Sequence, residues 1–348
     1  MKKIIENKFI FYSIIAAVSL YVLIVFVKNP GMNTYERAMF HDIIYGTAWK
    51  PYVYRVIVPV ITRTATALVP EDIQNNLSQT VEHNRNIKSL LEKFHWDSEN
   101  ITEYLIACFL IYIFLIGFVI AFRKLFNAIY FVPYWFLNLV TIFVLLGLPA
   151  MFEYYSYVYD FPTIFFFTLG LYLLRKKNWK LFLLMYLISC FNKETTILLT
   201  LVFAIHYYSN QEISTRDYRN LIVLQLLIFT TIKLLLFAIF IDNPGVFVEF
   251  HLADRTYLLW NGYNLATYVI WLVITLLVFS KWDEKPKFLK DALWVAVPLI
   301  ILTFILGLWD EWRDYYEVYP VIMMLATYTV AKIIGIEIKS VNAEYQKI

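Results

Sequence analysis

Charged side chains interrupt apolar stretches of this sequence at several points, and their types suit binding a phosphate or moving a proton. The clearest case is the segment NKET at 192–195, which joins two short apolar stretches. Charges within the depth of a membrane are costly and usually face a cavity or a partner. Lys193 and Glu194 are therefore candidate binding residues, unless they only pair with each other. Lys233, in the middle of another apolar stretch, must also face a partner or a water-filled cavity.

Two acidic residues nearer the start of the chain are candidates for a general base. Asp42 follows His41, and Glu36 lies six residues before Asp42. A carboxylate can accept the proton of an attacking hydroxyl group, so Asp42 is the first candidate and Glu36 competes with it. Further along, Arg55 opens an apolar segment within PYVYRVIVP. A guanidinium group there contacts lipid headgroups or binds a substrate phosphate bidentately.

Two aromatic and acidic clusters complete the candidate set. In EYYSYVYDFP, Glu153 and Asp160 flank four tyrosines, of which Tyr154 is the first. Aromatic faces beside carboxylates suit sugar rings, but tyrosines also anchor proteins at membrane interfaces, and Asp160 is well placed to cap the next helix. In WDEWRDYYEVYP, Arg313 is a candidate clamp for a phosphate or carboxylate. Alternatively, Arg313 forms an ion pair with Glu317, which lies four residues later and on the same face of a helix.

Composition restricts the class of protein. Of the 348 residues, 60% are hydrophobic and 16% are charged, whereas soluble domains have about 45–50% apolar and about 25% charged residues. This excludes a disordered chain, a coiled coil and a disulfide scaffold, and a net charge of +3 does not favour nucleic acid as a partner. Cys108 and Cys190 lie in apolar runs and predict no redox role. The sequence holds no Walker, GxGxxG, HExxH, CxxC or GxSxG motif, and its histidines have no metal-ligand spacing.

The apolar stretches predict an all-α, polytopic membrane protein with about ten membrane-spanning helices, several of them short. A helix needs roughly 20 apolar residues to cross a bilayer. Stretches of about this length lie at 9–27, 102–122, 129–149, 219–240, 263–280, 291–308 and 316–334. Shorter ones lie at 159–174, 180–192 and 196–208. The segment 56–69 is shorter still and predicts an interfacial or re-entrant helix.

The region 180–208 forms either one long helix or two short spans, and the distribution of Lys and Arg decides between them. With two spans, both termini are cytoplasmic and the later cytoplasmic loops hold Arg216, Arg219, Lys281, Lys285, Lys287, Lys290, Lys332, Lys339 and Lys347. The later external loops then hold only Arg255 and Arg313. Cytoplasmic loops of membrane proteins are enriched in Lys and Arg, so two spans are favoured.

This topology predicts a single membrane domain over 1–348. Its first extracytoplasmic loop, at about 28–101, is large and carries interfacial or re-entrant helices. The other external loops are short, at 150–158, 193–195, 241–262 and 309–315. Apart from Lys233, which lies in the middle of a span, the candidate residues above therefore gather at the external face.

In this order, the segments resemble the GT-C superfamily of integral-membrane glycosyltransferases. The resemblance rests on His41-Asp42 in the first external loop, YRVIVPVI after it, YDFPTIFFFTLGLYLL followed by RKKNWK, and FNKETTILL between two short helices. It implies a GT-C-like fold and an inverting transfer of a sugar from a polyprenyl-phosphate-linked donor to a glycan or lipid acceptor at the extracytoplasmic face. Such a reaction belongs to surface polysaccharide or glycoconjugate synthesis.

The resemblance also implies roles for the candidate residues. Asp42, or Glu36 in its place, would accept the proton of the acceptor hydroxyl. Arg55, Lys193 and Arg313 would stabilise the polyprenyl phosphate that leaves, since preorganised contacts of this kind strengthen as charge develops. The remaining predicted binding residues are Glu194, Glu153, Asp160 and Tyr154. No cofactor is implied beyond the lipid-linked sugar donor, no metal ligands are identified, and a requirement for a divalent metal stays open.

Two other functions compete with this interpretation. One is a polysaccharide polymerase or ligase that uses lipid-linked glycans. The other is a non-enzymatic lipid or solute transporter or flippase, which buried charges in short, broken helices would suit. In each case membrane lipids surround the protein. The abundance of Ile, Lys, Tyr, Phe and Asn is typical of bacteria with a low GC content and predicts a bacterial plasma (inner) membrane.

Overall fold

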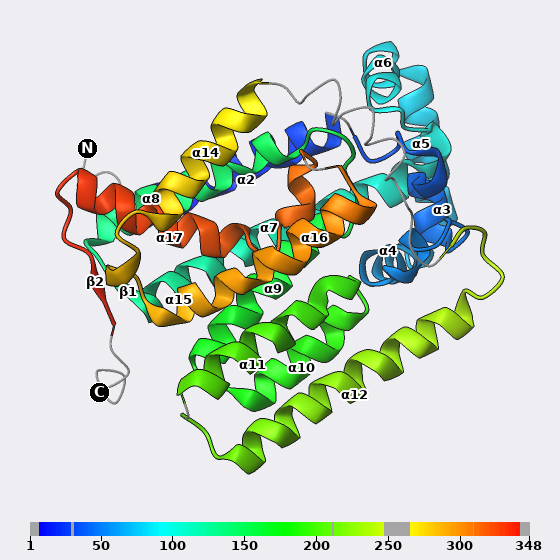
Figure 1. Cartoon of the computed structure of the whole chain (residues 1–348). Helices are drawn as coiled ribbons and strands as arrows, with labels where there is room; N and C mark the ends of the chain where they lie inside the picture. Colours follow the sequence, from blue (N-terminus) through cyan, green and yellow to red (C-terminus); the bar gives the residue numbers. More distant parts are fainter. Residues whose placement is uncertain (1–6, 29–30, 211, 247–264, 309, 342–348) are drawn as a thin grey trace.

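The computed structural model describes residues 7–28, 31–210, 212–246, 265–308 and 310–341, and within them the protein is mostly helical (Figure 1). Each predicted apolar stretch forms a helix. These are α2 (Lys8–Lys28), α7 (Ile101–Ile129), α8 (Tyr134–Leu146), α9 (Asp160–Arg175), α10 (Trp179–Cys190), α11 (Leu198–Asn210), α12 (Thr215–Ile239), α14 (Leu265–Phe279), α15 (Lys287–Ala292) continuing through η7 (Leu293–Val295) into α16 (Ala296–Leu306), and α17 (Tyr319–Ile333). Arg255, Trp309 and most of the predicted loop 241–262 lie outside the described residues.

Several helices are suited to a membrane. Among the described residues, five helical segments are long and apolar enough to cross one: Lys8–Lys28, Ser98–Ile129, Tyr134–Met151, Thr215–Ile239 and Lys287–Leu306. Shorter apolar helices are Trp179–Cys190, Leu265–Phe279 and Tyr319–Ile333. Large apolar side chains such as Phe109, Leu227 and Leu234 point away from the core and are more than half exposed. Such outward apolar faces suit contact with lipid, so the chain is an all-α protein built to associate with a membrane.

The centre of the bundle is the pair α7 and α9, which have the most extensive contact of any two helices described. Gly117 of α7 permits this approach, since a Cβ there would lie 2.9 Å from the ring of Phe165. Small residues at helix interfaces allow close packing where water provides no driving force between helices. The helices α2 and α8 pack around this pair, while α10, α11 and α12 form a second group below it in Figure 1.

The region 180–208 forms two short helices, as the charge distribution predicts. The 3₁₀ turn η5 (Glu194–Ile197) separates α10 from α11. Asn192 fixes the break, because its side-chain amide donates to the hydroxyl of Thr163 at 2.8 Å and to the carbonyl of Tyr159 at 3.2 Å. With 12 residues, α10 is about 18 Å long, well short of the roughly 30 Å of a hydrocarbon core.

Loops that share a predicted side of the membrane contact one another. At one end, the amide of Val56 donates to the carbonyl of Phe191 at 2.9 Å, and the side chain of Asn243 donates to two carbonyls of the first loop. At the other end, β1 (Tyr130–Phe131) pairs with β2 (Lys339–Ser340), and Lys177 contacts Glu212 at 2.9 Å. The structure thus separates the loops into two groups at opposite ends of the bundle (Figure 1).

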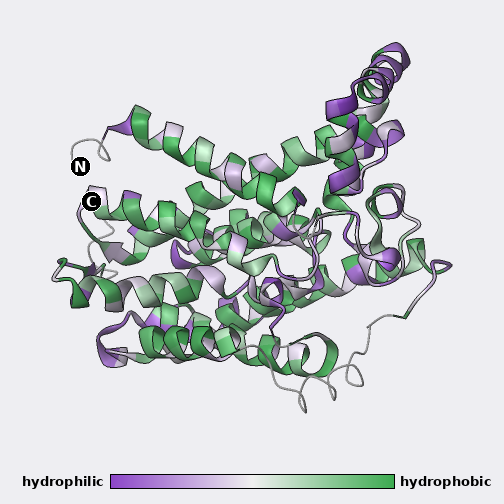
Figure 2. Ribbon diagram, turned by 90° about the horizontal axis from the view of Figure 1, so that it is seen from above, coloured by the Kyte–Doolittle hydropathy of each residue, from purple (hydrophilic) through white to green (hydrophobic). Residues whose placement is uncertain are grey.

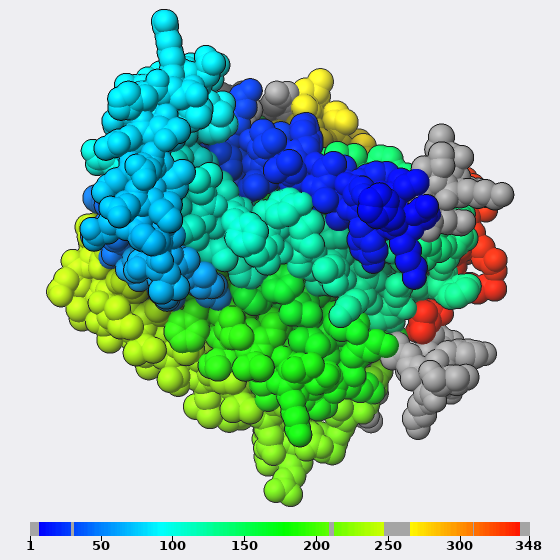
Figure 3. Space-filling model, turned by 180° about the vertical axis from the view of Figure 1, so that it is seen from behind, coloured from blue at the N-terminus to red at the C-terminus, as the bar shows by residue number. Residues whose placement is uncertain are grey.

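The first of these ends carries the helices of the long predicted loop. They are η1 (Glu36–Ala38), α3 (Phe40–Tyr45), η2 (Tyr52–Tyr54), α4 (Ile57–Ala67), α5 (Glu71–His83), α6 (Arg85–Phe94) and η3 (Ser98–Asn100). The helix predicted at 56–69 is α4, and the polar segment after it forms α5 and α6, which project from the bundle (Figures 1 and 3). Hydrophilic residues gather at this end (Figure 2).

Candidate functional site

A cavity of about 300 Å³ opens where several loops of this end meet. Segments far apart in the sequence line it: the turn η2, the break between α10 and α11, the middle of α12, the end of α16 and the turn η8 (Trp312–Tyr315). Its charged lining consists of Arg55, Lys193, Glu194, Lys233, Glu311, Arg313 and Asp314. Leu299, Leu302 and Leu306 of α16 form an apolar wall. The cavity is therefore amphipathic, because its lining combines four cations and three carboxylates with these leucines.

Arg55 is held rigidly in this cavity. Its side chain donates from Nη2 to Oε1 of Glu194 at 2.7 Å, and its guanidinium group lies 4.2 Å from the ring centre of Tyr159. Burial lowers the pKa of Arg55, but the charge and hydrogen bond of Glu194, together with Tyr159 and Tyr52, outweigh burial and raise that pKa. The Nε atom of Arg55 is buried without a hydrogen-bond partner in the described part of the chain. A buried donor of this kind is costly to leave unpaired, and an anionic ligand would satisfy it.

Lys193 is anchored by a deeper carboxylate. Its Nζ lies 3.2 Å from Oε1 of Glu317, which is fully buried. The hydroxyl of Thr195 donates to the same oxygen. The pairing differs from both sequence alternatives, since Lys193 does not pair with its neighbour Glu194 and Glu317 does not pair with Arg313. The long-range contacts join the α10–α11 break to the start of α17.

Arg313 belongs to a turn that separates two cavities. Its Nε donates to Oε1 of Glu311 at 2.7 Å, and its guanidinium group lies 4.5 Å from the ring centre of Tyr157. Trp312 and Tyr315 of the same turn instead line an apolar cavity of about 550 Å³ between α8, α14 and α17. The turn η8 therefore has a charged side and an apolar side.

Lys233 reaches the charged cavity from the middle of α12. Its Nζ donates to the carbonyl of Cys190 at 2.8 Å, at the end of α10. As the sequence predicts, this half-buried lysine faces a partner and a cavity, and its charge acts on Glu194. The carbonyl at the C-terminal end of a helix is a natural partner for a cation. Lys233 adds a fourth cation to the cavity lining.

The two predicted bases lie in the first loop and do not line this cavity. Asp42 is half-buried in α3, and its Oδ1 accepts a hydrogen bond from the hydroxyl of Thr47 at 2.8 Å. Glu36 is exposed in η1. The aromatic ring of Tyr35, next to Glu36, packs against Tyr52 with 5.5 Å between ring centres. This end of the first loop thus borders the cavity through aromatic contacts.

The predicted residues of the tyrosine-rich loop surround the cavity without lining it. Tyr154 donates to Oδ1 of Asp310 at 2.8 Å, which joins this loop to the one before α17. Glu153 is exposed, and partial burial together with the charge of Asp310 raises its pKa. The buried carboxylate of Asp160 accepts from the amide of Tyr157 at 2.9 Å and so fixes the loop whose rings support Arg55 and Arg313.

Sequence reasoning missed two cavity residues, Glu311 and Asp314. Both lie beside Arg313 in a visibly charged segment of the sequence. Their proximity to this candidate phosphate-binding residue was the signal that could have identified them. The spacing gave no reason to prefer them, because Arg313 was expected to share a helix face with Glu317, whereas the 3₁₀ turn η8 points its side chains differently. In this turn Arg313 faces Glu311 rather than Glu317.

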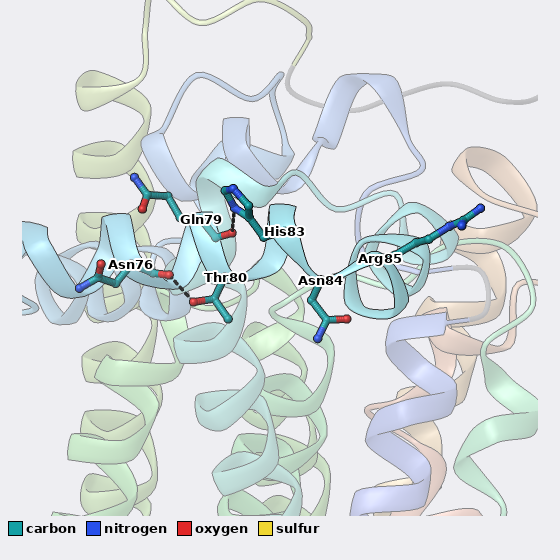
Figure 4. Close-up of a pocket in the computed structure, with 6 residues that line it drawn as sticks. All are labelled: Asn76, Gln79, Thr80, His83, Asn84 and Arg85. Carbon is teal, nitrogen blue, oxygen red and sulfur yellow. Dashed lines mark hydrogen bonds between the residues drawn. The ribbon is translucent and has the colours of Figure 1, made fainter.

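A second polar pocket, of about 610 Å³, lies on the surface of α5 and α6 (Figure 4). Two of its side chains bind back to their own helix: the hydroxyl of Thr80 donates to the carbonyl of Asn76 at 2.7 Å, and Nδ1 of His83 lies 2.7 Å from the carbonyl of Gln79. Asn84 caps α6 by accepting from the amides of Asn86 and Ile87. These groups stabilise helices, so the charged cavity is the stronger candidate site.

Within the described ranges, no group of three or more His, Cys, Asp or Glu side chains is placed to hold a metal ion. The charged cavity instead offers guanidinium and ammonium groups, which bind anions. No protein-family model, curated protein or solved structure matches this chain.

Proposed function

We propose that this protein is an inverting membrane glycosyltransferase that transfers a sugar from a polyprenyl-phosphate-linked donor to a glycan or lipid acceptor. The observation that carries the proposal is the amphipathic cavity, whose lining combines four cations, three carboxylates and three leucines. A polyprenyl phosphate has the same division between an anionic head and a hydrocarbon tail. Arg55, Lys193 and Arg313 are the proposed phosphate ligands, with Lys233 as a fourth.

The proposal includes an orientation and a location. With ten helices crossing, some of them short, the loops rich in Lys and Arg face the cytoplasm and so do both termini. The cavity then opens at the extracytoplasmic face of a bacterial plasma membrane. Because α10 is only about 18 Å long, the break after it lies below the level of the lipid headgroups. A lipid-linked phosphate can reach this depth from the side of the bilayer, and the fold proposed is GT-C-like.

In the proposed reaction, the cations of the cavity stabilise the leaving group. As the bond from the anomeric carbon to the phosphate oxygen breaks, negative charge grows on the polyprenyl phosphate. Preorganised donors aimed at such charge typically contribute about 3–4 kcal/mol each to transition-state stabilisation. Glu194 and Glu311 hold two guanidinium groups in place through ion pairs. Tyr154 and Asp160 fix the loop whose stacked tyrosines support Arg55 and Arg313.

The test is turnover by the purified protein in lipid nanodiscs. A panel of polyprenyl-phosphate sugars is supplied with candidate glycan and lipid acceptors, and release of polyprenyl phosphate is followed by mass spectrometry. We expect turnover with at least one donor and none with the matching polyprenyl sugars that lack the phosphate. Donor binding without turnover under any acceptor would favour a lipid transporter or flippase. Absence of donor binding would overturn the proposal.

A further inference from the structure

Three carboxylates line the charged cavity, and they differ in what holds them. Glu194 pairs with Arg55, and Glu311 pairs with Arg313. The carboxylate of Asp314 has no hydrogen bond or ion pair among the described residues. It is half-buried and opens to the cavity. Asp314 is therefore the cavity carboxylate that is free to act on a ligand.

Gly307 makes room for this carboxylate. A Cβ at position 307 would lie 2.9 Å from Oδ2 of Asp314 and 3.9 Å from Oε2 of Glu311. The backbone of Gly307 is extended, with φ −121° and ψ −167°, a conformation that other residues adopt without strain. The glycine is needed here for space rather than for its backbone freedom. The end of α16 thus leaves a gap in which Asp314 faces the cavity.

The charges around Asp314 suit a proton acceptor. Burial and the negative charge of Glu311 raise the pKa of Asp314 to about 6, against the opposing effect of Arg313, Lys193 and Arg55. A general base works best when its pKa lies near the operating pH. The same cations are the proposed ligands of the departing phosphate, so base and leaving-group contacts share one cavity.

We propose that Asp314 is the catalytic base that accepts the proton of the acceptor hydroxyl, in place of Asp42 or Glu36. This inference rests on the proposed glycosyltransferase function. The hydroxyl oxygen forms a bond to the anomeric carbon while its proton moves to a carboxylate oxygen of Asp314. The bond from that carbon to the phosphate oxygen breaks, and its electron pair stays on the polyprenyl phosphate. The sugar is transferred with inversion at the anomeric carbon.

The test compares three isosteric variants in nanodiscs: Asp314→Asn, Asp42→Asn and Glu36→Gln. A matched control is Asp72→Asn, an exposed residue of α5 outside the cavity. We expect Asp314→Asn to lower turnover by at least about 100-fold, the scale of general base catalysis, while its affinity for the polyprenyl-phosphate donor is kept. Retained donor binding shows that the variant is folded and separates loss of the base from loss of the site.

A pH profile provides the second readout. Wild-type kcat/KM should rise with pH through a midpoint of about 6, following the pKa of Asp314, and the residual activity of Asp314→Asn should lack this step. Asp314→Glu should recover part of the activity. Turnover by Asp314→Asn equal to that of the wild type, or a loss confined to Asp42→Asn or Glu36→Gln, would overturn the assignment while leaving the glycosyltransferase standing. A wild type that binds donor without turnover would instead reject the enzyme.

Discussion

The two ends of the bundle both bury charged groups but arrange them differently: at one end His206, Asp291 and Lys287 form a paired cluster, and at the other the charged groups line a cavity. At the end that carries β1 and β2, Nδ1 of His206 lies 2.7 Å from Oδ2 of Asp291, and Lys287 contacts the other oxygen of Asp291 at 2.9 Å. The rings of Phe288 and Tyr207 pack edge-on against the imidazole. This cluster ties α11 to α15 and is closed by aromatic packing.

The cavity at the opposite end is arranged differently. Within the described residues, Nε of Arg55 and Oε2 of Glu317 are buried without hydrogen-bond partners, and the Asp314 carboxylate is unpaired. Native proteins satisfy most buried polar groups, so each exception calls for an explanation. A packed and satisfied cluster indicates a structural role, whereas an incomplete cluster around a cavity indicates a ligand. The following predictions test this distinction.

The largest effect on stability is expected from Lys193→Met. It leaves the fully buried Glu317 without its cation, and breaking a buried ion pair in this way typically costs about 3–5 kcal/mol. Thermal or denaturant unfolding in detergent measures the loss. The double variant Lys193→Met with Glu317→Gln should recover a large part of it, because no uncompensated charge remains. A loss below about 1 kcal/mol in the single variant would contradict the central role of this pair.

A smaller effect is expected from His206→Phe at the opposite end. Asp291 keeps its contact with Lys287, so the loss includes a hydrogen bond to a buried carboxylate, which contributes about 1–3 kcal/mol. The same unfolding assay applies, together with donor binding. The account predicts lower stability and unchanged affinity for a polyprenyl phosphate. A change in affinity without a change in stability would reverse the comparison between the two ends.

The smallest effect is expected from Lys177→Met. Its contact with Glu212 at 2.9 Å joins two partly exposed side chains, and such pairs contribute about 0–1 kcal/mol. Unfolding midpoints at low and high salt provide the measurement. A loss comparable to that of His206→Phe would mean that exposed pairs also hold the loops of this end together.

The helices could be predicted directly from the sequence, because the apolar runs of this chain are long and few other secondary structures can bury runs of this length. Their ends were harder to place. The stretch predicted at 129–149 begins later, as α8 at Tyr134, because the residues before it form β1 and Pro133 precedes the helix. The stretch at 291–308 is interrupted by η7. Neither feature changes hydropathy, so an apolar pattern cannot reveal it.

For the candidate site, the sequence identified the cations better than the acids. Arg55, Lys193 and Arg313 were selected because charges beside apolar helices are costly, and the structure brings them to one cavity. Their partners come from distant segments, as in Arg55 with Glu194, and no spacing predicts such contacts. Asp314 was overlooked because its importance depends on the lack of a pairing partner for its carboxylate, which the sequence does not reveal.

The most direct test of the central claim is the affinity for a polyprenyl phosphate after removal of one cavity cation. Lys233→Met is the most suitable variant, because Lys233 donates its hydrogen bond to a backbone carbonyl. Its removal leaves no carboxylate unpaired, since Glu194 keeps its ion pair with Arg55. Arg85→Gln, on the exposed surface of α6, is the matched control. We predict an affinity about 10–100-fold lower for Lys233→Met, the scale of one charge-assisted hydrogen bond, and no change for Arg85→Gln. Equal affinities for Lys233→Met and the wild type would contradict the claim that this cavity binds the lipid phosphate.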